Sequence, residues 1–164
     1  MERRSAADRL RKEEHPTAEE ETRNKASARR FYEDVWNKGN VALIDELVAP
    51  QHVQHDPNNP NTAPGPAGIR QLVSLYRSAF PDAHFTIEDI LAAGDKVVVR
   101  VTATGTQERA LPGVPATGKR VSATGISITR YKDGKAAETW IVFDFLGMFQ
   151  QLGVVPVPES ASTG

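Results

Sequence analysis

Asp144 is the carboxylate in this sequence whose surroundings most favour proton transfer. It lies between Phe143 and Phe145, close to the end of an apolar run. Removing a carboxylate from water raises its pKa toward the range that is useful for moving a proton near neutral pH. An aspartate in this position can instead cap the helical turn that begins near Leu146, by accepting backbone N–H bonds. Asp144 is therefore the first catalytic candidate, with helix capping as the competing role.

Two histidines, His52 and His55, lie three residues apart in the segment HVQHDP. An imidazole at the start of a proline-rich connection could act as a base near neutral pH. A histidine pair also suggests a metal site, but the chain has no cysteine and only Asp56 is close enough in sequence to be a third ligand. The sequence therefore predicts no metal site, and the alternative for these histidines is hydrogen bonding to the loop backbone.

Arg100 interrupts the apolar run Val97 to Val101. With the two-residue alternation of a strand, it shares a face with Val98 and Thr102. An inward arginine would polarise a carbonyl or hold a carboxylate of a substrate, whereas an outward one would be solvated, and the outward orientation is favoured. Arg130 and Glu138 are expected to form a surface pair.

Helical periodicity dominates the first half of the chain. Thr17 and Glu20 have the spacing of a capping box, and apolar residues then recur at helical intervals as far as Gly39. A second, shorter helix is expected from Asn40 to Pro50. The proline-rich segment 56–66 is expected to be a loop, and a third helix should follow it and end at Pro81.

The period of the apolar residues changes from about 3.6 to 2 after Pro81. Four strands are predicted at 84–93, 96–106, 120–131 and 136–145, and the tight turns between them favour an antiparallel meander. Helices followed by an antiparallel sheet indicate an α+β fold, in which a bent sheet forms a cone over three helices. The open end of such a cone is a natural ligand pocket. A last helical turn is expected at 146–152.

Composition limits the classes of function. The chain has 164 residues, 39% of them hydrophobic, and a formal net charge of −1, which predicts one domain and no binding to nucleic acid or membranes. No apolar stretch approaches 18 residues and the amino terminus lacks the core of a secretory signal, so a cytoplasmic protein is expected. The charged segment 1–24 is predicted to be a disordered arm, 25–154 the folded domain and 155–164 a flexible tail.

Five segments together resemble the SnoaL-like polyketide cyclase (ester cyclase) family, within the nuclear transport factor two-like superfamily. They are FYEDVWNKGN, GIRQLVSLYRSAFPD, LPGVPATGK, YKDGK and TWIVFDFLGMFQQLG, and they occur in the family's order. The resemblance implies a cone-shaped α+β fold, a homodimer, no cofactor, and a hydrophobic small molecule as substrate. Several aromatic residues lie on the elements expected to line the cone, and an aromatic wall suits a flat, conjugated substrate, although core packing explains them equally well. They are Trp36, Tyr32, Tyr76, Trp140 and Phe143.

The resemblance also points to one departure. In the family's aldol cyclases an aspartate on the last strand is the acid/base, and counting from the shared Asp-Phe-x-Gly pattern places that position at Ile141. A histidine on the preceding strand falls at Ser127. His55 matches a place where family members direct a polar side chain into the pocket, so it becomes the second catalytic candidate beside Asp144.

Three functions follow from these observations. The first is a cyclase, isomerase or dehydratase of secondary metabolism that moves protons on a polyketide-like substrate without a cofactor. The second is a non-catalytic module that binds a hydrophobic ligand or stabilises a partner protein, which the isoleucine at position 141 favours. The third is epoxide opening, which requires more than one inward carboxylate. The first two functions can be distinguished by the position of Asp144 and His55, because catalysis requires at least one of these side chains to lie inside the cavity.

Overall fold

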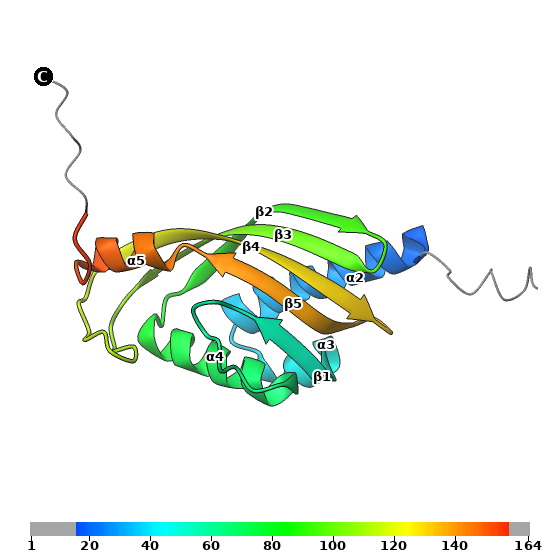
Figure 1. The fold of residues 1–164 in the computed structure, drawn as a ribbon, viewed down its shortest axis with the longest axis horizontal. Helices are drawn as coiled ribbons and strands as arrows, with labels where there is room; N and C mark the ends of the chain where they lie inside the picture. Colours follow the sequence, from blue (N-terminus) through cyan, green and yellow to red (C-terminus); the bar gives the residue numbers. More distant parts are fainter. Residues whose placement is uncertain (1–15, 158–164) are drawn as a thin grey trace, which may run out of the picture.

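The computed structural model describes residues 16–157. In it, a curved five-stranded sheet lies over helices (Figure 1). The strand order is β1-β5-β4-β3-β2. This confirms the predicted α+β class. The strands are β1 (Val48–His55), β2 (His84–Ala93), β3 (Lys96–Thr106), β4 (Arg120–Lys132) and β5 (Lys135–Phe143), and the helices are α2 (Ala18–Arg30), η1 (Phe31–Asn37), η2 (Val41–Leu43), α3 (Ile44–Leu47), α4 (Gly65–Ala79) and α5 (Phe145–Leu152).

Helix α2 begins with the capping box that the sequence predicts. The Thr17 hydroxyl accepts a bond from the Glu20 backbone N–H, and the Glu20 carboxylate accepts one from the Thr17 N–H, at 3.2 and 2.8 Å. Residues 18–24 are therefore helical and Asn24 is buried, so the folded part begins earlier than the predicted boundary at residue 24. The rest of the predicted arm, and the tail from residue 158, lie outside the described residues.

The first helix does not keep one geometry up to Gly39. After Arg30 the chain continues as the π-helix η1, and a helix of this type often occurs next to a functional site. The Asn37 side chain fixes the end of η1 to β2, because it donates to the Phe85 carbonyl at 2.9 Å and accepts from the Phe85 N–H at 2.7 Å. This clamp holds the η1 aromatic residues against the sheet.

The sequence predicts four strands, whereas the sheet has five, because strand β1 was not expected. Strand β1 extends from Val48 to His55 and pairs in parallel with β5, where His55 lies opposite Trp140. Pro50 and several polar residues hide this strand from a search for alternating apolar residues, and proline is tolerated here because β1 is an edge strand. The remaining strands form the expected meander, with the long connection 107–119 between β3 and β4.

The helices cover one face of the sheet and leave the other open (Figure 1). Helix α4 packs beside β1, α2 and η1 lie against β2 and β3, and α5 contacts β4 at one end of the sheet. The buried core includes Val73 of α4, Val99 of β3 and Met148 of α5. None of the helices within residues 16–157 has both the length and the apolarity needed to cross a membrane.

Candidate active site

A cavity of about 160 Å³ lies between the concave face of the sheet and the helical layer. Its wall is mainly apolar, with contributions from α2, η1, α4 and all five strands. Among the lining residues that the structure describes, Asp56 is the one carboxylate and His52 the one imidazole. An apolar pocket with a few convergent polar groups is the usual form of a small-molecule site.

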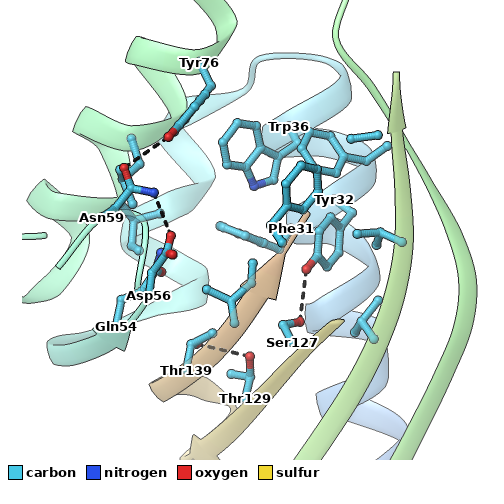
Figure 2. A pocket seen from close by; sticks show the side chains of 18 of the residues that line it. Phe31, Tyr32, Trp36, Gln54, Asp56, Asn59, Tyr76, Ser127, Thr129 and Thr139 are labelled. Carbon is cyan, nitrogen blue, oxygen red and sulfur yellow. Dashed lines mark hydrogen bonds between the residues drawn. The ribbon is translucent and has the colours of Figure 1, made fainter. Parts of the chain in front are cut away.

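Asp56 is held at the cavity wall by the turn that follows β1. Its carboxylate accepts bonds from the Asn58 N–H at 2.9 Å and from the Asn59 side-chain amide at 2.7 Å. The Asn59 carbonyl oxygen in turn accepts a bond from the Tyr76 hydroxyl of α4 at 3.1 Å. Figure 2 shows this chain of three side chains on one side of the pocket. Asp56 is therefore buried, oriented, and fixed to the helix across the loop.

A buried hydroxyl pair lies on the opposite side of the pocket (Figure 2). The Tyr32 hydroxyl of η1 and the Ser127 hydroxyl of β4 are 3.1 Å apart. Burial raises the pKa of the Tyr32 phenol, and the bond with Ser127 offsets this only in part. The phenol therefore keeps its proton at neutral pH and is available as a hydrogen-bond donor.

His52 lies on the inward face of β1 and is only 2% exposed. Its Nε2 atom is 3.0 Å from the Thr139 hydroxyl, which is 3.1 Å from the Thr129 hydroxyl. Burial lowers the pKa of His52 to about 4, and the charge of Glu138 opposes this shift. His52 is therefore neutral at physiological pH, with a ring nitrogen in a chain of hydroxyl groups.

The buried neutral His52 predicts a specific pH dependence of stability. Because its pKa is near 6.5 when unfolded and about 4 when folded, the unfolded chain binds more protons between these values. Stability therefore falls as the pH drops below 6.5, by about 2 kcal/mol between pH 7 and pH 5 from this group, and the loss is complete near pH 4. Urea unfolding at both pH values should show a smaller decrease for His52→Gln than for wild type.

The matched control for this measurement is His84→Gln, because His84 is exposed at the start of β2. That variant should keep the wild-type pH dependence. Equal pH dependence in wild type and His52→Gln would contradict the assignment of this loss to His52.

Ile141 and Ser127 lie directly opposite each other on β5 and β4, and both line the cavity. These are the positions at which the resemblance would place the acid/base aspartate and its histidine. The counting from the Asp-Phe-x-Gly pattern is therefore consistent with the geometry, because the two positions form one spot on the pocket wall. At this spot the chain carries a hydroxyl and an aliphatic side chain instead of ionisable groups.

The structure does not place the two predicted catalytic residues in the cavity. Asp144 is exposed and accepts a bond from the Gly147 N–H at 2.8 Å, so it caps α5. The His55 side chain points to the outer face, where its ring stacks on Trp140 and its Nε2 atom is 2.9 Å from the Glu138 carboxylate. This outer position follows from strand alternation, because His55 is an odd number of residues after His52, which faces inward.

Four of the six predicted substrate-binding residues line the cavity, and two, Arg100 and Trp140, do not. Arg100 faces outward and pairs with Asp89 at 2.6 Å, and Trp140 is 38% exposed on the outer sheet face. The expected pair of Arg130 with Glu138 is present at 3.0 Å. The lining residues are Tyr32, Trp36, Tyr76 and Phe143.

The polar residues that reach the cavity differ from the catalytic candidates that the sequence favours, although His52 and Asp56 were considered there as a possible base and a possible metal ligand. His52, Gln54 and Asp56 recur at every second position and all line the pocket. This is the spacing of one strand face, so the signal was present once the segment was taken as a strand. In residues 16–157 no group of three or more histidine, aspartate or glutamate side chains is arranged to hold a metal ion.

Comparisons of the sequence with known proteins agree on one family. A family model described as SnoaL-like polyketide cyclase matches residues 26–152. An aklanonic acid methyl ester cyclase of Streptomyces peucetius is 31% identical over 133 residues, covering 77% of this chain and 89% of the relative. Another from Streptomyces sp. strain C5 is 30% identical over 119 residues, covering 71% of each.

Solved structures agree with this result. TsrD from Streptomyces laurentii superposes with a TM-score of 0.74 at 30% identity, covering 82% of this chain and 97% of that one. The sequence match and the fold therefore agree. The chain belongs to the SnoaL-like polyketide cyclase family.

Proposed function

We propose that this protein cyclises or isomerises a hydrophobic, polyketide-like molecule in the cavity by acid/base catalysis without a cofactor, and that Asp56 is the base. Membership of the SnoaL-like family supports a cyclase role. The two curated relatives described above are named as cyclases of aklanonic acid methyl ester. Aromatic polyketide methyl esters are therefore the first substrates to test.

The position of Asp56 carries this proposal. His55 pairs with Trp140 in the parallel register of β1 and β5, and Asp56 and Ile141 are the residues that follow this last pair on the two segments. Both also line the cavity. A carboxylate at the end of β1 can therefore act at the place where the family resemblance puts an aspartate on β5.

The surrounding groups suit proton transfer at a carbon next to a carbonyl. In the proposed step Asp56 accepts a proton from that carbon, and the Tyr32 hydroxyl donates a hydrogen bond to the developing enolate oxygen. The carbanion then attacks a second carbonyl of the same molecule, forming a carbon–carbon bond. The proton returns from Asp56 to the new alkoxide, so no atom is gained or lost.

The proposal is tested by incubating aromatic polyketide methyl esters with wild type, Asp56→Asn and Asp144→Asn, and following products by mass spectrometry and proton NMR. Product should form with wild type and Asp144→Asn, because Asp144 caps α5 outside the cavity. Ligand-induced thermal shifts should persist in all three proteins. Binding without turnover in every protein would favour the second candidate, a non-catalytic ligand-binding module, which Ile141 in place of a carboxylate already supports.

We also propose that the protein is a homodimer that pairs through the sheet face turned away from the helices. Large apolar side chains are exposed on this face, including Ile126 at 49% and Val142 at 68%. An exposed apolar patch of this kind is typical of an interaction surface. The patch consists of Ile126, Ile128, Trp140 and Val142, around an open cleft of about 650 Å³.

Charge on this face favours a second copy as the partner. Arg100 is already paired with Asp89, and Glu138 with both Arg130 and His55. These charges are paired within one copy, so none of them requires an oppositely charged partner, and the apolar patch between them can pack against the same patch of a second copy. An acidic or basic partner protein would gain little from such a surface.

Sedimentation equilibrium tests the homodimer. Wild type should sediment as a dimer, and Val142→Asp should sediment as a monomer, because two-fold pairing would bury two like charges together. Leu146→Asp is the control, since Leu146 is 60% exposed on α5 and does not line the cleft. A monomeric wild type, or equal dissociation by both variants, would reject this interface.

A further inference from the structure

The inward face of strand β4 lines the cavity with one interruption. Ala123 and Ser127 both line it, whereas Gly125, which lies between them on the same face, does not. Gly125 is paired with Phe143 of β5. A methyl group at residue 125 would overlap Cδ2 of the Phe143 ring and lie 3.2 Å from its Cε2. The Phe143 ring therefore occupies the space that a side chain of residue 125 would take.

Phe143 also lies between the two apolar clusters that border the cavity. One cluster contains Met148 and the other contains Val99. Among the apolar side chains that the structure describes, only Phe143 packs against both of these clusters. The next residue, Asp144, donates its backbone N–H to the Thr124 carbonyl at 2.9 Å. The ring therefore stands between the two ends of the cavity, on main chain that is anchored to β4.

The two ends of the cavity differ in chemistry. On one side of the Phe143 ring the inward residues of β4 carry hydroxyl groups, as Figure 2 shows for Ser127 and Thr129. On the other side the lining is apolar and includes Val121. Thr129 and Val121 are each four residues from Gly125 in the sequence, which is about 13 Å along a strand. A ligand that contacts both ends must therefore extend past the Phe143 ring.

Little space is left around this ring. The whole cavity is about 160 Å³, and a dry cavity of about 150 Å³ is known to hold one benzene molecule. A second fused ring would need the volume that the Phe143 side chain occupies. We propose that Phe143, seated on Gly125, limits the cavity to ligands with a single ring. This inference rests on the proposed function and narrows its substrate class to polyketide-like molecules that carry one ring.

The test compares phenol with 2-naphthol, which carry the same hydroxyl group but differ by one fused ring. Wild type should bind 2-naphthol no more tightly than phenol. Phe143→Ala should raise the affinity for 2-naphthol relative to phenol by about 10-fold or more, because the second ring becomes buried in the space released. Phe143→Leu, which removes less volume, should raise the same ratio by about 3-fold. Calorimetric titration of each probe gives the dissociation constants.

Phe149→Ala is the matched control for these variants. Phe149 packs against the same cluster as Met148 but does not line the cavity. Its truncation should therefore loosen this cluster and leave the ratio of affinities at the wild-type level. An equal rise in Phe149→Ala, or no rise in either Phe143 variant, would overturn the inference. Tighter binding of 2-naphthol than of phenol by wild type, or no binding of phenol at millimolar concentration, would also overturn it.

The seating of the ring on Gly125 is tested by stability. Gly125→Ala should lower the melting temperature, because the new methyl group displaces the Phe143 ring. In the Phe143→Ala background the same substitution should cause less than about half of this fall, since the ring is absent. Equal falls in the two backgrounds would show that Gly125 does not hold the ring.

None of these readouts requires turnover. Full turnover by Asp56→Asn would reject the proposed base and leave the ratio of affinities unchanged. A failed ratio would leave the turnover results unchanged. The proposed function and the size limit set by Phe143 can therefore fail separately.

Discussion

Asp56→Asn is expected to lower turnover of a polyketide methyl ester by about 100-fold or more, because a positioned general base contributes roughly 10² to 10⁴. Asparagine has nearly the same size and keeps one oxygen that can accept the bond from the Asn58 N–H. Its amide nitrogen cannot accept the bond from the Asn59 side chain, so the variant should fold and bind ligand with a modest fall in melting temperature. Steady-state kinetics should show the loss in kcat, with KM changed by only a few-fold.

A rescue experiment separates a catalytic role of Asp56 from a role in folding the loop. Since Asp56 and Ile141 follow the last pair of β1 and β5 and both line the cavity, we expect a carboxylate introduced by Ile141→Asp to act on the same part of the substrate. The double variant Asp56→Asn with Ile141→Asp should regain at least a tenth of wild-type turnover. Wild-type turnover in Asp56→Asn alone would show that another group is the base.

Gly68→Ala is expected to cause a large loss of stability for so small a substitution in α4. A methyl group at residue 68 would overlap the Ala63 carbonyl oxygen and lie 2.7 Å from its carbon. Overpacking against backbone costs about 1 to 3 kcal/mol, which corresponds to a fall in melting temperature of roughly 3 to 10 °C in a domain of this size. Calorimetry or thermal circular dichroism measures this change directly.

The same substitution should also weaken ligand binding. Ala63 belongs to the connection between β1 and α4 that carries Asp56 and Asn59, so relief of the overlap displaces the residues that hold the carboxylate. Ser74→Ala is the control, because Ser74 is exposed on the same helix and its change should leave the melting temperature within about 1 °C of wild type. A Gly68→Ala protein as stable as this control would contradict the packing argument.

Local signals in the sequence were sufficient to predict most of the helices and strands. The capping box at Thr17, the helical repeat that ends before Pro81, and the two-residue alternation of the last four strands each depend on neighbours within a few residues. Such patterns are properties of a short segment, and the structure confirms them. Strand β1 was missed because an edge strand can contain proline and polar residues, so its identity depends on its pairing with β5.

For the candidate site, too, some features could be predicted from the sequence and others could not. The sequence by itself determined the α+β class, the family, and the substitution of Ile141 at the expected aspartate position. It could not determine which of several polar residues face the cavity, because that depends on the register of β1 against β5 and on the turn after His55.

Tertiary structure alone decided that Asp144 caps α5, that His55 stacks on Trp140 outside the cavity, and that His52 and Asp56 line it. The physical reason is that the orientation of a side chain in a strand alternates with every residue. A shift of one residue in pairing moves a whole set of groups from solvent to the cavity.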